Sequence, residues 1–221
     1  MMVDETYDRA ACRQRLMAGA IEMGLDLDAR QQALMIEFLA LLVKWNSAYN
    51  LTAVREPLEM VGRHLLDSLA LLPHLKPGPC LDMGTGAGVP GIPLAIMRPD
   101  SDFVLLDSNS KKIRFVRQAK LELGLVNVQP VHARVEQYQA DRPFKTLIAR
   151  AFTALPNMFA LSAGLHQPGV EILAMKGSIP EQEIAQLPAH VMTDVIPLRV
   201  PFEAGERCLV RISQVAGFHA K

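Results

Sequence analysis

Hydrophobic and polar residues follow two different patterns along the chain, and the change falls near residue 77. Within Leu27–Lys44, apolar residues recur every three or four positions with charged residues between them, which is the spacing of one face of a helix. Pro57 stands where the first residue of a second helix, continuing to Leu72, is expected. A run rich in proline and glycine at positions 73–79 ends this part. We therefore expect a helical extension over residues 1–76 and a second domain over 77–221, packed as one compact unit.

Beyond residue 77, short apolar runs alternate with helical stretches. The strands are expected at Pro79–Met83, Asp102–Leu106, Val126–His132, Lys145–Arg150 and Val170–Met175. The helices are expected at Gly91–Met97, Lys111–Leu123, Leu155–Leu165 and Pro180–Leu187. Such alternation predicts a mostly parallel sheet. Residues 190–200 and 206–215 are two strand-like runs with no helix between them. They predict a C-terminal antiparallel hairpin that closes the sheet of an α/β fold.

Glycines cluster directly after the first expected strand, in the stretch CLDMGTGAGVPGIPLA at positions 80–95. They are Gly84, Gly86, Gly88 and Gly91. Each glycine costs backbone entropy on folding, so a cluster between apolar residues needs a reason. Glycines between a strand and a helix let the backbone approach a ligand, and the helix N-terminus favours anionic groups. The loop therefore predicts a nucleotide-like cofactor, with Gly84 and Gly86 among its contacts.

Two carboxylates narrow the choice of cofactor. Gly86–Gly91 satisfies the G-x-G-x-x-G pattern that is typical of dinucleotide binding. However, Asp82 stands just before the first glycine, where it would repel a pyrophosphate and attract the ammonium and sulfonium charges of S-adenosylmethionine. Asp107 ends the second expected strand, where a carboxylate accepts the ribose hydroxyls of either cofactor. The pattern favours S-adenosylmethionine over NAD.

Charge and cysteine content set limits on partners and compartment. Lys plus Arg and Asp plus Glu number 23 each, so any nucleic acid must be met by a local patch. The three cysteines lie far apart, without the spacing of metal ligands, and we expect reduced thiols and no metal. No signal peptide and no apolar run long enough to cross a membrane is found. We expect a cytoplasmic monomer.

Seven short motifs carry a family resemblance. They are NLTAVRE (50–56), RHLLDSL (63–69), LDMGTGAGVPGIPLAI (81–96), LLDSNSKKIRFVRQ (105–118), ARVEQY (133–138), ARAF (149–152) and AMKG (174–177). In this order they resemble the RsmG (GidB) family of bacterial 16S rRNA guanine-N7 methyltransferases, over about residues 28–213. The resemblance implies the class I, Rossmann-like methyltransferase fold. It also implies methyl transfer from S-adenosylmethionine to N7 of a guanine, position 527, in the 530 loop of 16S rRNA within the small ribosomal subunit.

Cofactor contacts follow from the same resemblance. Carried over residue by residue, they fall on Gly84 and Val89 in the glycine loop, on Val135 and Glu136 after the third strand, and on Arg150 at the end of the fourth. Gly84 admits backbone contact with the methionine end, and Val89 supplies an apolar wall. The backbone at Val135, together with Glu136, can face the adenine.

Guanine N7 is neutral and carries an in-plane lone pair, so its attack on a sulfonium methyl needs no proton removed. We therefore expect no general base, and catalysis by in-line positioning. Arg150 and Lys176 end central strands, where ligands bind in open α/β sheets. We assign both to positioning, with Lys176 directed to a phosphate or to guanine O6. Because the product base is cationic, excess positive charge beside the ring would slow the reaction.

A basic arc is expected on the helix over residues 111–123. At about 100° per residue, cations and apolar residues fall on opposite halves of this helix, with Lys112 the exception. The cations are Lys111, Arg114, Arg117 and Lys120, which we take as candidate contacts to RNA phosphates. His64 is a further candidate, because the resemblance leaves it either facing the RNA or tying the extension to the core.

Two other functions remain open from the sequence. An NAD-dependent oxidoreductase could use the same glycine loop. Asp82 counts against it, as does the lack of an obvious set of residues to support hydride transfer. A non-enzymatic RNA-binding module could retain a cofactor fold. Zero net charge counts against tight non-specific binding, so such a module would need a structured target.

Overall fold

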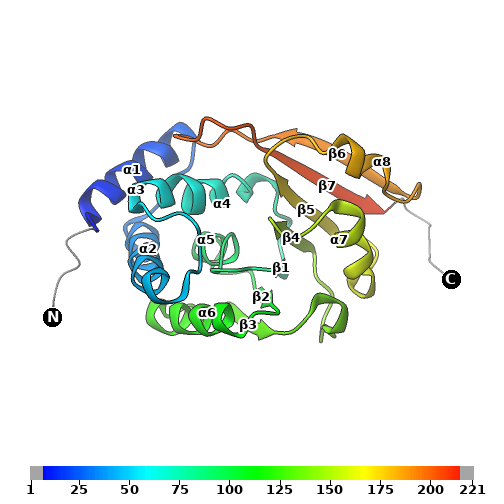
Figure 1. Cartoon of the computed structure of the whole chain (residues 1–221), viewed down its shortest axis with the longest axis horizontal. Helices are drawn as coiled ribbons and strands as arrows, with labels where there is room; N and C mark the ends of the chain where they lie inside the picture. Colours follow the sequence, from blue (N-terminus) through cyan, green and yellow to red (C-terminus); the bar gives the residue numbers. More distant parts are fainter. Residues whose placement is uncertain (1–6, 215–221) are drawn as a thin grey trace.

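A seven-stranded sheet forms the centre of the molecule, in the order β3-β2-β1-β4-β5-β7-β6 (Figure 1). The computed structural model describes residues 7–214, so the outer ends of both expected domains, 1–6 and 215–221, lie outside it. The strands are β1 (Cys80–Met83), β2 (Phe103–Asp107), β3 (Val128–His132), β4 (Thr146–Arg150), β5 (Glu171–Lys176), β6 (Val191–Pro197) and β7 (Cys208–Gln214).

Strands β1 to β5 are parallel, and β7 pairs antiparallel with both β5 and β6. The expected α/β fold with a C-terminal hairpin is thus confirmed, with β7 lying between β5 and β6. Strand order reverses at β1, which lies between β2 and β4, and Met83 at its end pairs with Ala149 of β4. Open α/β sheets bind ligands at such a switch point, beyond the carboxyl ends of the strands.

Helices occupy most of the chain before the sheet. They are α1 (Arg9–Glu22), α2 (Ala29–Tyr49), α3 (Pro57–Met60), a π-helical segment η1 (Val61–Leu66), α4 (Asp67–Leu69) and a short 3-10 turn η2 (Leu72–His74). Asp28 begins α2 with a capping box, because its Oδ1 accepts from the Gln31 amide at 2.7 Å while Gln31 Oε1 accepts from the Asp28 amide at 2.9 Å. Pro57 is the first residue of α3, as its fixed φ favours.

The helices that follow the strands are α5 (Gly91–Met97), α6 (Ser110–Leu123), η3 (Val135–Gln137), α7 (Leu155–Leu161), η4 (Ala163–Leu165) and α8 (Glu181–Ala185). Helix α7 ends four residues earlier than the pattern predicts. Ser162 breaks it, because its hydroxyl donates to the Met158 carbonyl at 2.9 Å and lies 2.8 Å from His166 Nε2.

Two hydrophobic cores lie on opposite faces of the sheet. On one face, α1, α2, α5 and α6 pack together, and Phe38 and Trp45 of α2 contact Phe115 of α6 with ring centroids 6.2 and 5.7 Å apart. On the other face, Leu155 and Met158 of α7 pack against strand residues. Figure 1 shows α1–α6 and α7–α8 as these two groups. The extension therefore shares a continuous core with the second expected domain.

Candidate active site

The glycine loop connects the end of β1 to the first residue of α5. Gly84, Gly86 and Gly88 have φ of +70°, +59° and +76°, a conformation that L side chains rarely adopt. A Cβ at Gly84 would lie 2.5 Å from Cδ2 of Phe152, so the ring rests directly on this glycine. At Gly86, a Cβ would meet nothing closer than the Gly84 carbonyl oxygen at 3.9 Å. The loop thus has an open stretch of backbone at Gly86 and an aromatic cover at Gly84.

Asp82 holds this loop from beneath. Its Oδ2 accepts from Thr85 Oγ1 at 2.6 Å and from the Gly91 amide at 2.9 Å, while Oδ1 is buried with no partner among the described residues. Burial raises the pKa of Asp82 to about 6, against the opposing effect of these two hydrogen bonds. Asp82 therefore fixes the loop, and its attraction for a cofactor's positive charge remains a prediction.

Asp107 lies across the loop at the end of β2. Its Oδ2 accepts from the Gly86 amide at 2.9 Å and its Oδ1 from the Asn109 amide at 2.8 Å. The Nζ of Lys112 lies 3.8 Å from the same Oδ2. From the sequence, Lys112 was the one cation of this helix expected outside the basic arc. In the structure its side chain extends toward the glycine loop.

The remaining expected cofactor residues occupy the same edge of the sheet. Val89 is buried in the glycine loop, two residues before α5, and Val135 is buried in the η3 turn that follows β3. Glu136 beside it is exposed, with Oε1 4.0 Å from Nη1 of Arg134. Because β1 and β3 are parallel, these residues follow their carboxyl ends, as the resemblance implies.

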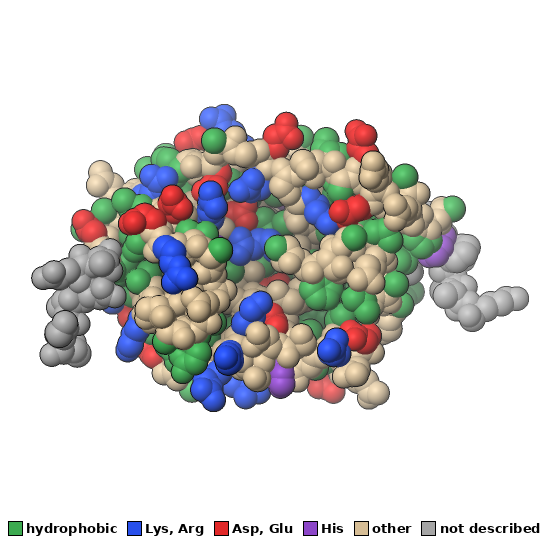
Figure 2. Space-filling view, viewed as in Figure 1, with side chains coloured by type: hydrophobic (Ala, Val, Ile, Leu, Met, Phe, Trp, Pro, Cys, Tyr) green, Lys and Arg blue, Asp and Glu red, His purple; other side chains and the backbone are tan. Residues whose placement is uncertain are grey.

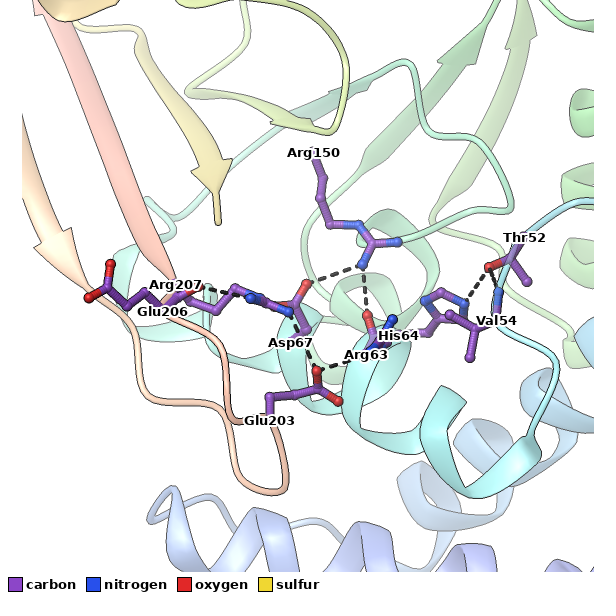
Figure 3. A network of polar contacts seen from close by, with 9 residues as sticks. All are labelled: Thr52, Val54, Arg63, His64, Asp67, Arg150, Glu203, Glu206 and Arg207. Carbon is purple, nitrogen blue, oxygen red and sulfur yellow. Dashed lines mark hydrogen bonds and ion pairs between the residues drawn. The ribbon is translucent and has the colours of Figure 1, made fainter. Parts of the chain in front are cut away.

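Arg150 reaches from the end of β4 to the helical extension (Figure 3). Its Nη1 donates to the Arg63 carbonyl at 2.7 Å and to Asp67 Oδ2 at 3.1 Å. Arg207 approaches the same buried carboxylate from the β6–β7 loop, with Nε 3.5 Å from Oδ1. Glu203 completes the network, with its Oε2 3.4 Å from Nη2 of Arg207. The motifs contain Asp67 and Arg150, whereas nothing in the sequence signals Arg207.

His64 lies inside this region and is buried. Its Nε2 lies 2.9 Å from Thr52 Oγ1, and burial, followed by the nearby Arg150 charge, lowers its pKa to about 4. A neutral, buried imidazole cannot reach an RNA phosphate. The position of His64 favours the other role weighed for it, that of tying the extension to the core.

A cavity of about 300 Å³ opens where β4 and β5 end. We call it the β4–β5 cavity; its lining includes Phe152, Met158, Lys176 and Glu183. Lys176 Nζ donates to Glu183 Oε2 at 2.8 Å and to the Thr153 carbonyl at 3.3 Å. The sequence singled out Lys176, but it missed Phe152, although ARAF contains it, and Glu183, which stands on an expected helix.

The basic arc is present on α6. Ile113, Phe115, Val116, Ala119 and Leu123 are buried, whereas Lys111, Arg114 and Arg117 are exposed and Lys120 is half-buried. Figure 2 shows Lys and Arg side chains along the lower edge of the molecule, where Figure 1 places α6. The arc can meet phosphates, and its contact with RNA remains a prediction.

Two classes of feature are absent from the described part of the chain. Within residues 7–214, no three His, Cys, Asp or Glu side chains gather as a metal-binding group, and no helix has the length and apolar character needed to cross a membrane. Cys12, Cys80 and Cys208 are free and buried.

Comparison with known proteins identifies close relatives. The family model described as "GidB: rRNA small subunit methyltransferase G" matches residues 31–210. A ribosomal RNA small subunit methyltransferase G from Marinobacter nauticus is 49% identical over 201 residues, covering 90% of this chain and 94% of the relative. One from Stutzerimonas stutzeri is 48% identical over 200 residues, covering 89% and 93%.

Solved structures of more distant proteins share the fold. The glycopeptide N-methyltransferase MtfA, complexed with S-adenosylhomocysteine, matches with a TM-score of 0.58 at 12% identity, over 68% of this chain and 90% of that one. TrmN from Thermus thermophilus matches with a TM-score of 0.53 at 15% identity, over 70% and 53%.

Proposed function

The chain belongs to the rRNA small subunit methyltransferase G family, and from this premise we propose that it methylates N7 of guanine 527 in the 530 loop of 16S rRNA. It is an S-adenosylmethionine-dependent rRNA methyltransferase, as its family is. The choice of N7 and of position 527 rests on the resemblance of the seven motifs. Family membership leaves no support for the NAD-dependent alternative.

The glycine loop is the observation that carries the cofactor part of this proposal, because its residues fit S-adenosylmethionine. The backbone is open at Gly86, and Asp107 stands beside it to accept ribose hydroxyls. Buried Asp82 retains an oxygen without a partner among residues 7–214, which favours a positive group nearby. Val89, Val135 and Glu136 would complete the site around the cofactor.

S-adenosylmethionine, when bound, would supply an electrophilic methyl group, and the neutral N7 lone pair of guanine could accept it without loss of a proton. No side chain has to remove a proton, so the residues act by orienting the reactants. Arg150 contributes a fixed guanidinium, whose charge is offset by Asp67 at 3.1 Å. That offset limits repulsion of the cationic product.

On the RNA side, we propose that Lys111, Arg114, Arg117 and Lys120 contact phosphates of the rRNA. A single exposed arc suits a protein with no net charge, since affinity then depends on one structured target. We also propose that the protein acts as a monomer in the cytoplasm, where small ribosomal subunits assemble.

Transfer of labelled methyl to small subunits from cells lacking this gene tests the proposal, with the labelled base mapped. We expect label at N7 of guanine 527, lost with Arg150→Ala and with Gly84→Val. Gly164→Ala is the matched control, because that glycine has open space around it and no unusual φ. Label at another atom or base would overturn the N7 assignment, and no label despite cofactor binding would overturn the rRNA substrate.

A further inference from the structure

The β4–β5 cavity adjoins the glycine loop, and its polar wall holds Lys176, which we expect to face a phosphate or guanine O6, together with Glu183. Phe152 belongs to both, since its ring rests on Gly84 and also lines the cavity. The pairing of β1 with β4 also places the loop beside the cavity, because Met83, directly before the loop, pairs with Ala149 on the cavity wall. A base in this cavity would lie next to the glycine loop, with an aromatic ring available for stacking.

Lys176 and Glu183 form a fixed pair on the cavity wall. Their side chains are 19% and 33% exposed, so each keeps a surface open to a ligand. Glu183 Oε2 accepts from Lys176 at 2.8 Å and from the Leu155 amide at 2.6 Å. Both bonds use Oε2, and Oε1 makes no hydrogen bond with a described residue. The wall therefore presents one ammonium donor beside one carboxylate acceptor in a set orientation.

The carboxylate of this pair is ionised at neutral pH. Burial acts to raise the pKa of Glu183, but the hydrogen bonds from Lys176 and the Leu155 amide outweigh it and lower the pKa. The two opposite charges leave the wall with no net charge. A cationic product base can then form beside Lys176 with little repulsion.

We propose that Lys176 and Glu183 select guanine as the acceptor by binding its Watson–Crick edge; this inference rests on the proposed function. Lys176 donates to O6, and Glu183 accepts from N1–H and the 2-amino group. Adenine presents an amino donor to the lysine and a bare N1 to the carboxylate, so the same pair rejects it. N7 lies on the opposite side of O6 from N1, and binding through this edge leaves N7 free for methylation.

Hypoxanthine tests this assignment, because it lacks only the 2-amino group of guanine. Small subunits are reconstituted with 16S rRNA carrying either base at the acceptor position, and initial methylation rates are compared. We expect the wild-type protein to methylate guanine about tenfold faster than hypoxanthine, or more. The free energy of one hydrogen bond to a charged group corresponds to a factor of at least this size. In Glu183→Gln, guanine methylation falls and the preference drops below about threefold, while S-adenosylmethionine affinity by calorimetry is unchanged.

Glu181→Gln is the matched control, since Glu181 is exposed on the same helix. It should keep the wild-type rate and preference. Equal loss on both bases in Glu183→Gln would overturn the inference, because it is the result of a purely structural role. Equal wild-type rates on both bases would also overturn it. Failure of the wild-type protein to methylate guanine-bearing subunits would overturn the proposed function itself, and the inference with it.

Discussion

Nη1 of Arg150 lies 3.1 Å from Oδ2 of Asp67, a residue 83 positions earlier in the chain. The bond joins the end of a central strand to the helical extension, and Nε of Arg207 lies 3.5 Å from the other carboxylate oxygen as an ion pair. The orientation of the predicted cofactor residue Arg150 thus depends on a helix outside the sheet.

Asp67→Asn tests that dependence. Arg150 would lose its carboxylate partner and Arg207 would keep only Glu203, and we expect a stability loss of about 2 kcal/mol, below that of a fully buried pair because both arginines are partly exposed. Urea unfolding measures the stability, and steady-state kinetics should show reduced methyl transfer. Asp194→Asn, which removes a 68% exposed carboxylate 3.9 Å from Arg211, should change stability by less than about 1 kcal/mol. Unchanged kinetics in Asp67→Asn would refute a positioning role.

Gly84→Ala should impair cofactor binding. The new Cβ meets the Phe152 ring and requires an L residue at a φ of +70°, which costs about 1 to 2 kcal/mol. In wild type, S-adenosylmethionine at a hundred times its dissociation constant should add about 2.7 kcal/mol to stability. We expect this increment to be largely lost in Gly84→Ala and kept in Gly164→Ala, as measured by thermal unfolding. Equal increments in the two variants would contradict the assigned role of Gly84.

His64 should make stability depend on pH. Its pKa falls from 6.5 to about 4 on folding, so the unfolded chain binds the extra proton first and stability decreases as pH falls through this range. The difference in unfolding free energy between wild type and His64→Gln should shrink by about 2 kcal/mol from pH 7 to pH 5. Taking the difference cancels the contributions of His166 and Asp82, whose shifted pKa values of about 4 and about 6 lie close to this pH range. A constant difference would show that His64 titrates normally.

The basic arc of α6 should determine the salt dependence of subunit binding. Removing one cation that pairs with a phosphate lowers the slope of log affinity against log salt by about 0.7 to 0.9. Arg114→Gln with Arg117→Gln should therefore weaken binding and reduce this slope by about 1.5. Arg13→Gln with Arg30→Gln removes the same charge from exposed sites on α1 and α2, and should leave the slope nearly unchanged. Equal slopes for the two double variants would show that the α6 cations do not contact RNA phosphates.

Residues 77–214 alone should not fold cooperatively. Without the extension, Phe115 of α6 no longer packs against Phe38 and Trp45, and one face of the sheet loses much of its cover. Residues 7–214, by contrast, should unfold in one sharp urea transition. A sharp transition for 77–214 would instead make the predicted boundary at residue 77 that of an independent domain.

The sequence by itself determined the elements and the type of site. Apolar periodicity places α5 at Gly91–Met97 as observed, and it identifies each strand of the parallel sheet to within two residues. Local signals suffice there, because proline, glycine clusters and helical or alternating spacing act on neighbouring residues. The glycine cluster also predicted a cofactor loop, because glycines between a strand and a helix let the backbone approach a ligand, and three of them have the left-handed φ that L side chains rarely adopt.

Only the tertiary structure decided which side chains meet. Arg207 reaches Asp67, Phe152 covers Gly84, and Glu183 binds Lys176 through contacts that join separate elements. It also placed His64 in the interior, where the motif alone allowed either burial or exposure. Spacing along the chain predicts the face on which a residue lies. The partner across that face depends on strand order and helix packing, and these are set by the whole core.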